Sequence, residues 1–185
     1  MKAMAAAAPP HPGDASPIAI AISPLDGNAR TGSQVWLGHR SRLTGDPTMP
    51  PATHRAIIAE RTELPELPEF LWRGMRISTH GSTSSGAANA IVLGFMKVAA
   101  EAEDEFADWY ETEHMPGLAA LPGVLSAARY RAIDGDGPAY LALYRLEELT
   151  VSQSPQWMAA ARTPWSARMR RFTFDYARYS FELAR

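Results

Sequence analysis

The segment E-F-A-D-W-Y-E-T-E-H-M-P, residues 105–116, constrains the fold and the candidate site more than any other stretch of this 185-residue chain. Its apolar and aromatic side chains recur at the three- and four-residue spacing of an amphipathic helix. Acidic residues at positions 101 and 103–105 occupy the first turns, where the helix dipole favours anions. Pro116 and Gly117 then predict the end of the helix. The segment therefore predicts one amphipathic helix that carries His114 near its C-terminal end.

His114 is the only histidine after residue 87, and it is the candidate catalytic residue. Imidazole has an ordinary pKa near neutrality, which suits a group that transfers protons. His114 is therefore predicted to exchange a proton with a ligand, or to anchor the ligand at the mouth of a pocket. The alternative interpretation is structural, because a histidine at a helix end interacts favourably with the C-terminal dipole and the last carbonyl groups.

The composition of the chain changes near residue 87. Residues 1–87 contain ten of the fifteen prolines but only three of the seventeen aromatic residues. A segment with so few large apolar side chains is predicted to be a disordered, low-complexity extension, because it buries too little surface to offset the entropy of ordering. Residues 56–72 could instead form a short recruited helix or a partner-binding motif. A further alternative is that translation begins at Met75 or nearby, so that the extension is not part of the protein.

Residues 88–185 alternate between strand and helix patterns and are predicted to form one domain. Residues 90–98 are a continuous apolar run, which is typical of a strand buried on both faces. The sequence D-G-D-G at 134–137 predicts a hairpin between two later strands. The predicted elements are a strand at 90–98, a helix at 105–116, strands at 124–133 and 139–146, a helix at 155–162 and a strand at 170–182. This β-α-β-β-α-β order is the ferredoxin-like arrangement of an α+β fold.

The strand at 139–146 carries large apolar groups on both of its faces. Tyr140, Ala142 and Tyr144 lie on one face, and Leu141 and Leu143 lie on the other. Two helices can cover only one face of a four-stranded sheet, and a large exposed apolar face is a liability on a monomer. The pattern therefore predicts a homodimer in which two sheets pack face to face and form a closed barrel.

Several parts of the second half resemble the dimeric α/β-barrel superfamily, and in particular its EthD-like branch and related uncharacterised bacterial proteins. The resemblance is carried by F-A-D-W-Y-E-T-E-H-M-P at 106–116, L-P-G-V at 121–124, A-R-Y at 128–130 and P-A-Y-L-A-L-Y at 138–144. It covers residues 88–183 and nothing upstream. Members include cofactor-free monooxygenases, polyketide cyclases, lactone isomerases, haem enzymes and proteins with no known reaction. The resemblance implies a small-molecule pocket between helix and sheet.

Four aromatic residues and one arginine are the predicted ligand-binding residues: Trp109, Tyr110, Tyr130, Tyr144 and Arg129. The aromatic side chains could line a cleft for a flat, apolar molecule, and Arg129 could bind an anionic group. The alternatives are an ordinary helix core face for the aromatic residues and an exposed strand face for the arginine. Adjacent helix positions diverge by about 100°, so we expect one of Trp109 and Tyr110 in the core and the other at the cleft.

Charge and composition exclude several classes of function. The net charge is −2, and residues 88–185 sum to −3, which argues against a nucleic-acid partner. No apolar run reaches the roughly 18 residues of a membrane span, so we predict no membrane association. The absence of cysteine excludes disulfides and thiolate sites and fits a cytoplasmic protein. With no second histidine in residues 88–185, we predict no metal and no cofactor.

Two functional hypotheses follow. In the first, the protein is a cofactor-independent enzyme of oxygenase, cyclase or isomerase type that acts on an aromatic or polyketide-like compound, with itself and that small molecule as its partners. In the second, the barrel is a non-catalytic binding or assembly module. A cavity of roughly 300 Å³ or more in contact with His114 would favour the first hypothesis.

Overall fold

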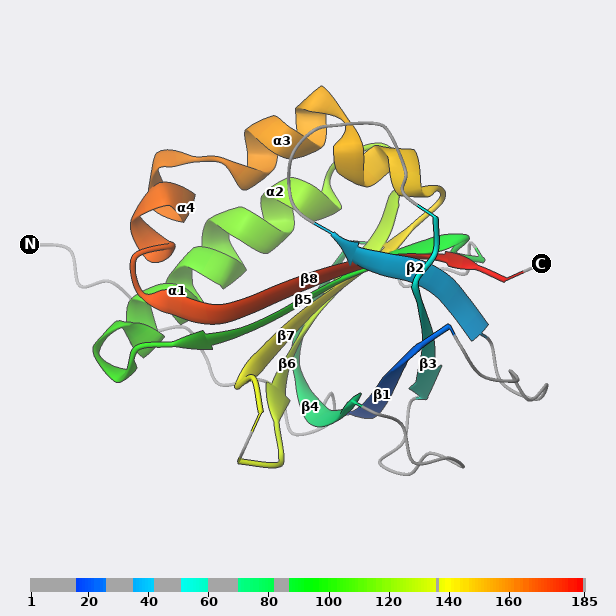
Figure 1. Ribbon diagram of the computed structural model, residues 1–185. Coiled ribbons are helices and arrows are strands. Elements are labelled where there is room, and N and C mark those ends of the chain that lie inside the picture. Colours follow the sequence, from blue (N-terminus) through cyan, green and yellow to red (C-terminus); the bar gives the residue numbers. More distant parts are fainter. Residues whose placement is uncertain are drawn as a thin grey trace, which may run out of the picture.

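The structure, a computed structural model, describes residues 16–25, 35–41, 51–59, 70–81, 87–135 and 137–184. Within these residues, eight strands close into an antiparallel barrel in the order β1-β3-β2-β8-β5-β7-β6-β4 (Figure 1). The strands are β1 (Pro17–Pro24), β2 (Val35–Ser41), β3 (His54–Ala59), β4 (Phe70–Gly81), β5 (Ala90–Val98), β6 (Val124–Ala132), β7 (Tyr140–Leu146) and β8 (Thr173–Leu183). The helical elements are η1 (Ala100–Ala102), α1 (Glu103–Trp109), η2 (Tyr110–His114), α2 (Met115–Ala119), η3 (Leu149–Gln153), α3 (Pro155–Ala161) and α4 (Pro164–Met169).

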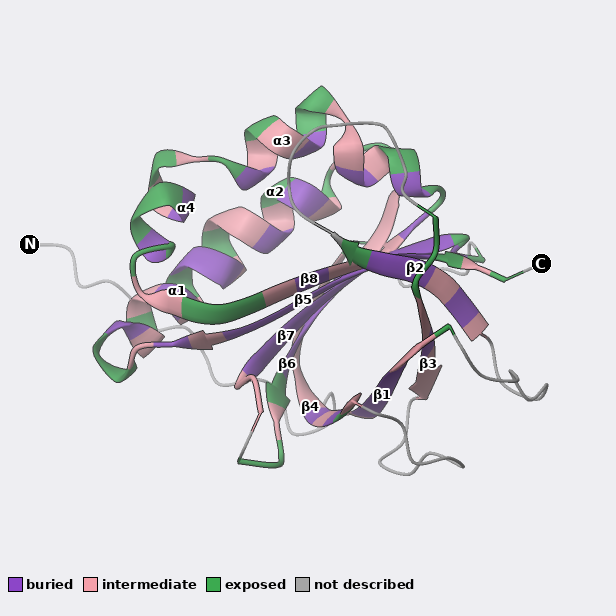
Figure 2. Cartoon of the chain, in the orientation of Figure 1, coloured by how far each residue is buried: buried purple, intermediate pink, exposed green. Residues whose placement is uncertain are grey.

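The second half of the chain has the predicted ferredoxin-like arrangement. Its strands lie in the order β8-β5-β7-β6, and every neighbouring pair is antiparallel. Strand β5 begins and ends at the residues that the apolar run predicts. The helices lie together on one face of this sheet (Figure 1), and their buried sides are turned toward it (Figure 2). No helix among the described residues has both the length and the apolar character needed to cross a membrane.

Short polar motifs start the last two helices. The Ser154 hydroxyl accepts a hydrogen bond from the Trp157 amide at 3.1 Å, and Thr163 does the same for Ser166 at 3.0 Å. A proline follows each of these capping residues at the first helical position, where its missing amide hydrogen has no consequence. The two motifs divide the single predicted helix at 155–162 and the residues after it into α3 and α4.

The prediction of disorder for residues 1–87 is wrong wherever the structure describes this part of the chain. Strands β1 to β4 lie there and complete the barrel with β5 to β8. Strand β4 pairs with β6, and β2 pairs with β8. The alternative of a short recruited helix at 56–72 does not hold at the two ends of that segment, because these residues belong to β3 and β4. The remaining residues of the predicted extension lie outside the described residues.

Small and β-branched side chains explain how this aromatic-poor half folds. Strand β1 reads P-I-A-I-A-I-S-P, and residues 18–22 are all buried. Its isoleucines face the barrel interior together with the only two tryptophans before residue 87, Trp36 and Trp72. Because β-branched residues suit the pleated surface of a sheet, a strand with prolines only at its two ends forms readily. Pairing with the apolar sheet of the second half supplies the buried surface that the composition of the first half alone does not provide.

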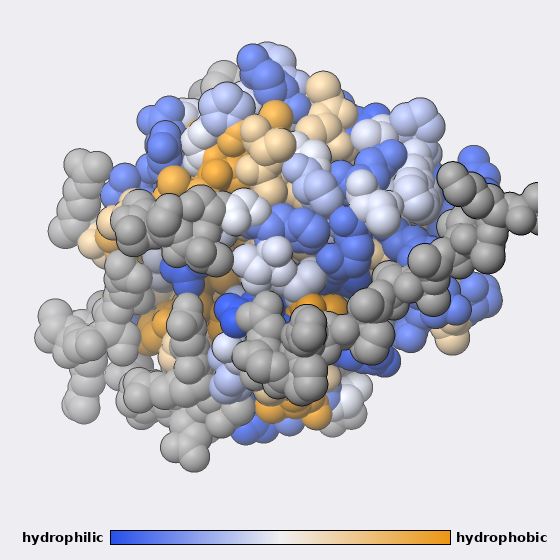
Figure 3. Space-filling view, turned by 180° about the vertical axis from the view of Figure 1, so that it is seen from behind, coloured by the Kyte–Doolittle hydropathy of each residue, from blue (hydrophilic) through white to orange (hydrophobic). Residues whose placement is uncertain are grey.

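The sheet face for which a second chain was predicted is covered within this chain. Leu141 and Leu143 are buried in the barrel interior beside Ile18, Ile20 and Trp72. The faces of β7 therefore alternate as predicted, but strands β1 to β4 take the place of the partner copy. The apolar face that led to the prediction of a homodimer is therefore buried within one chain. The rear of the molecule shows hydrophilic side chains over much of the described surface (Figure 3), and a homodimer stays a prediction.

The helix does not end at Pro116 as predicted. Residues Tyr110–His114 form one π-helical turn, in which the Met115 amide donates to the Tyr110 carbonyl five residues earlier. The α-helix then resumes through Pro116 and Gly117 to Ala119. A proline cannot donate to the preceding turn and its ring crowds that carbonyl, so a widened turn directly before it lets the helix continue.

Candidate functional site

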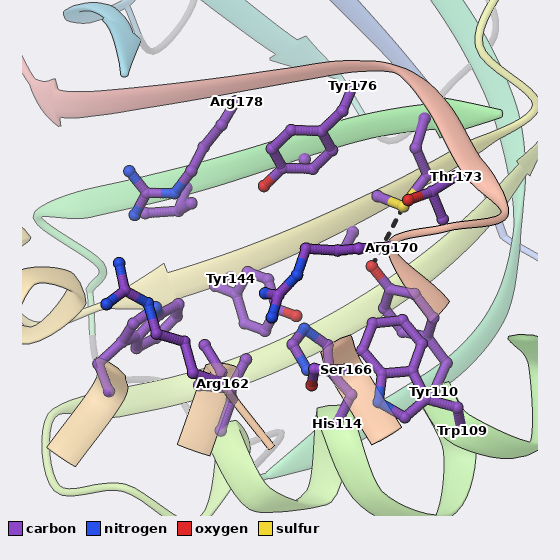
Figure 4. A pocket seen from close by; sticks show the side chains of 17 residues that line it. Trp109, Tyr110, His114, Tyr144, Arg162, Ser166, Arg170, Thr173, Tyr176 and Arg178 are labelled. Atoms are coloured by element: carbon purple, nitrogen blue, oxygen red, sulfur yellow. Dashed lines mark hydrogen bonds between the residues drawn. The ribbon is translucent and has the colours of Figure 1, made fainter. Parts of the chain in front are cut away.

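A pocket of about 620 Å³ lies between the helices and the outer face of β5, β7 and β8. Its size is within the range of small-molecule sites, and His114 is one of its lining residues. Figure 4 shows ten labelled side chains that line it from both layers. The lining residues are Val92, Gly94, Met96, Trp109, Tyr110, His114, Leu118, Ala142, Tyr144, Trp157, Ala161, Arg162, Ser166, Arg170, Thr173, Tyr176 and Arg178.

The π-helical turn brings three of the predicted site residues together. Trp109 and His114 are five residues apart, and their ring centroids are 4.4 Å apart. In an α-helix this spacing points in divergent directions, whereas the wider π turn stacks residues five apart. Tyr110 contacts the same histidine at 5.1 Å between ring centroids. Trp109 and Tyr110 both line the pocket, so the expectation that only one of them would do so is not met.

His114 is held in its neutral form. Burial, and to a smaller extent the charge of Arg170, lowers the pKa of His114 from 6.5 to about 4. Its Nδ1 atom is enclosed and has no hydrogen-bond partner among the described residues. At neutral pH the ring therefore carries one nitrogen lone pair that can accept a proton. The alternative reading of His114 as a helix-end cap does not apply, because the helix continues past it.

The tyrosines of the pocket remain phenols rather than phenolates. Burial raises the pKa of Tyr110, Tyr144 and Tyr176. The Tyr110 hydroxyl donates to the Met96 Sδ atom at 3.3 Å. The Tyr144 hydroxyl is enclosed and has no partner among the described residues. These hydroxyl groups can donate hydrogen bonds to oxygen atoms of a ligand, but they cannot act as bases near neutral pH.

Three arginines that the sequence analysis did not assign to the site also line the pocket. Arg162 follows α3, Arg170 follows α4, and Arg178 lies on β8. Strand β8 carries a bulge between the pocket residues Thr173 and Tyr176: its three steps from Phe174 to Ala177 match two steps of β5, and Asp175 has a φ of 52°. Alternation along β8 places Arg178 with Tyr176 on the outer face, opposite the interior residue Ala177, whereas Arg162 and Arg170 follow helices and no strand pattern places them.

Arg129 and Tyr130, which were predicted to bind ligand, lie elsewhere. Tyr130 is buried in the barrel interior. Arg129 is 3% exposed, and its guanidinium carbon lies 4.8–5.0 Å from the ring centroids of Phe106, Tyr110 and Tyr140. Neither residue lines the pocket. Arg129 lies outside the pocket and packs against the face of the Tyr110 ring, which lines it.

A polar network fixes the π-helical turn to the barrel. The Glu111 carboxylate accepts hydrogen bonds from the Ser78 hydroxyl at 2.6 Å and from Arg129 at 3.4 Å. Its second oxygen lies 3.0 Å from His80 Nε2. Ser78 and His80 both belong to β4, so the first half of the chain holds the turn that carries His114. No cluster of three or more histidine, aspartate or glutamate side chains suited to a metal ion occurs among the described residues.

No protein-family pattern and no curated protein matches this sequence. Solved structures do share its fold. An anthrone oxidase-like protein is 13% identical, with a TM-score of 0.56, over 93% of this chain and 92% of its own. A heme-degrading enzyme from Listeria monocytogenes is 11% identical, with a TM-score of 0.54, over 91% of this chain and 99% of its own.

A third structure is described as an uncharacterized ferredoxin fold protein related to antibiotic biosynthesis monooxygenases, also from Listeria monocytogenes. It is 10% identical, with a TM-score of 0.54, and the match covers 94% of this chain and 98% of its own. The chain therefore has the ferredoxin-like α/β-barrel fold of these proteins. Each match covers more than nine-tenths of this chain. The structural likeness therefore includes residues well before residue 88, whereas the sequence resemblance begins at residue 88.

Proposed function

We propose that the pocket binds an aromatic or polyketide-like small molecule and that neutral His114 accepts a proton from it. The observation that carries this proposal is the 620 Å³ pocket with His114 in its wall. An oxygenase, cyclase or isomerase of the cofactor-independent type needs such a step, in which an acidic O–H or C–H bond breaks and its electron pair stays on the ligand. The resemblance of residues 106–116 to the EthD-like branch supports a small-molecule ligand for this pocket.

Arg170 favours this step. Arg170 and His114 line the same pocket, and the positive charge of Arg170 acts on the imidazole. A phenolate or enolate formed beside His114 would be stabilised by Arg170 and would itself stabilise the protonated imidazole. The burial that lowers the pKa of His114 in the free protein is then offset by the new negative charge. In an isomerase or cyclase the proton returns to another ligand atom, and in an oxygenase the carbanion reacts with molecular oxygen.

The proton transfer can be tested with 4-nitrophenol, whose phenol and phenolate forms have different absorption spectra. We expect the bound probe to be ionised at a lower pH than the free probe, because His114 takes its proton. The variant His114→Phe should bind the probe but lose this difference, whereas His54→Phe, outside the pocket, should retain it. If His114→Phe ionises the bound probe like the native chain, the proton-acceptor role is wrong. If the probe does not bind at all, the non-catalytic alternative is favoured.

Haem is a second candidate ligand, because one imidazole and three arginines line the same pocket. Neutral histidine is the form that binds iron, and arginines pair well with carboxylates such as the two of haem. When bound, haem would supply chemistry with molecular oxygen, and a heme-degrading enzyme shares this fold. Haemin should then give a sharp shift of its absorption band that His114→Phe removes. An unchanged haemin spectrum would exclude this candidate.

A further inference from the structure

The pocket differs in charge from the protein that contains it. The chain has 20 acidic and 18 basic residues, apart from histidine. The pocket lining nevertheless includes Arg162, Arg170 and Arg178 and no aspartate or glutamate. Charged groups of one sign that line a cleft raise the local concentration of ligands of the opposite sign. The local excess of positive charge therefore favours negatively charged ligands.

We propose that the ligand is an aromatic acid whose carboxylate lies at Arg178 and Tyr144 and whose ring system lies against Trp109. The inference rests on the proposed function, since it concerns the same pocket, and it narrows the substrate from aromatic compounds to anionic ones. In Figure 4, Arg162 and Arg178 lie on one side of the pocket, and Trp109 and Tyr110 lie on the other. The two ends of the pocket are therefore chemically different.

Tyr144 provides an independent sign of a polar ligand group in the pocket. Its side chain is 4% exposed, lines the pocket, and has a hydroxyl group without a partner among the described residues. A buried hydroxyl group that makes no hydrogen bond destabilises a fold. An acceptor atom on a bound ligand would remove this cost. A carboxylate oxygen is such an acceptor, and the tyrosine can donate to it because burial keeps the phenol protonated.

Arg178 is placed to meet the same carboxylate. It is 6% exposed, and its Nη1 atom donates to the Ser180 hydroxyl at 3.0 Å, which fixes the plane of the guanidinium group. Arg178, Tyr144 and Tyr176 line the same pocket, and the positive charge of Arg178 acts on both tyrosines. A planar guanidinium group held in this way suits two parallel hydrogen bonds to a carboxylate.

The aromatic end offers a flat surface. Trp109 is 6% exposed and packs against Phe106 at 5.9 Å and His114 at 4.4 Å between ring centroids. Its Nε1 atom is enclosed and has no partner among the described residues, so it is a further donor for a ligand oxygen. An aromatic acid bound with its carboxylate at Arg178 would direct its ring toward this wall and toward His114.

The test compares 2-naphthoate with 2-naphthamide, which has a similar shape but no charge, by calorimetry on the full chain. We expect 2-naphthoate to bind about tenfold more tightly, because its carboxylate pairs with Arg178. Arg178→Gln should remove this preference, and Tyr144→Phe should weaken 2-naphthoate about fivefold while raising the melting temperature. Arg131→Gln, which removes an exposed arginine of β6 that does not line the pocket, is the matched control and should change neither affinity.

Each other outcome overturns the inference. Equal affinity for the two probes, unchanged in Arg178→Gln, would show a pocket that ignores charge and would leave the proposed function intact. A preference for 2-naphthoate that Arg131→Gln also removes would be an effect of overall charge. If neither probe binds while 4-nitrophenol does, the ligand is not an aromatic acid. If Arg178→Gln does not fold, Tyr144→Phe decides. A higher melting temperature with unchanged 2-naphthoate affinity would show that the Tyr144 hydroxyl does not bind the carboxylate.

Discussion

The two halves of the barrel have sheets with the same strand order but different roles. Strands β1 to β4 lie in the order β4-β1-β3-β2, and strands β5 to β8 lie in the equivalent order β8-β5-β7-β6, antiparallel throughout. The second half carries four α-helices and the pocket, whereas the described part of the first half carries no helix. One sheet thus closes the barrel, and the other, with its helical layer, forms the candidate site.

The comparison shows how one chain can replace a symmetric partner. The seams between the halves are β4 with β6 and β2 with β8, so the second strand of each half pairs with the fourth strand of the other. This is the pairing expected of two copies related by a twofold axis. The described part of the first half supplies the four strands that such a barrel needs, although residues 1–87 contain far fewer aromatic residues than residues 88–185.

The largest expected effect comes from removing the closing half. A chain that begins at Ser85 should lose cooperative thermal unfolding, because Leu93, Phe95, Leu141 and Leu143 would face water. A chain that begins at Ser16 keeps every described strand and serves as the control. Circular dichroism during heating measures both. A melting temperature equal to that of the full chain after removal of residues 1–84 would show that the halves are energetically independent.

A smaller effect is expected at the seam between β2 and β8. A Cβ atom on Gly38 would lie 1.9 Å from the Ser180 carbonyl oxygen and 2.7 Å from the Phe181 Cα atom. Gly38→Ala must therefore displace backbone and should cost about 3 kcal/mol in free energy of unfolding, at the upper end for overpacking. Gly117→Ala on α2 meets no atom within 4 Å and should stabilise by up to about 1 kcal/mol. Urea titrations give both free energies of unfolding. Equal stability of the two variants would contradict the close packing of β2 against β8 at Gly38.

The helical half should show a pH dependence that originates at His114. Its pKa is about 4 in the folded chain against 6.5 as its ordinary value, so the unfolded chain binds the proton more readily. Its contribution to stability is complete above pH 6.5 and is lost as the pH falls toward 4, which amounts to about 2 kcal/mol between pH 7 and pH 5. His114→Phe should lose this difference. A variant with the unchanged pH dependence would place the titration at another residue.

The sequence predicted the second half well because its patterns are local. The apolar run of β5, the hairpin at 134–137 and the alternation along β7 each depend on neighbouring residues alone. The family resemblance, rather than a local pattern, predicted a pocket; Trp109, Tyr110, His114 and Tyr144 line the pocket of the structure, whereas Tyr130 and Arg129 do not. Local patterns could not find the π-helical turn or the β8 bulge, because each is an extra residue whose position is fixed by tertiary packing.

The first half was misjudged because composition was given more weight than periodicity. The alternation I-A-I-A-I at 18–22 is a strand signal, and its flanking prolines mark the ends of the strand rather than disorder. Whether such a strand is ordered depends on a partner sheet that lies far away in the sequence. Arg129 was likewise assigned to a ligand because its three aromatic contacts come from α1, the π-helical turn and β7, which no local pattern brings together.

Hydrogen exchange of the full chain, followed by mass spectrometry, tests the central claim most directly. Strand β1 is paired on both sides, with β3 and with β4, as β5 is with β7 and β8. If one chain closes the barrel, the amides of residues 18–22 should be protected to an extent similar to those of residues 91–95, because both strands open only when the barrel unfolds. Complete exchange of residues 18–22 within seconds, while residues 91–95 stay protected, would contradict the account.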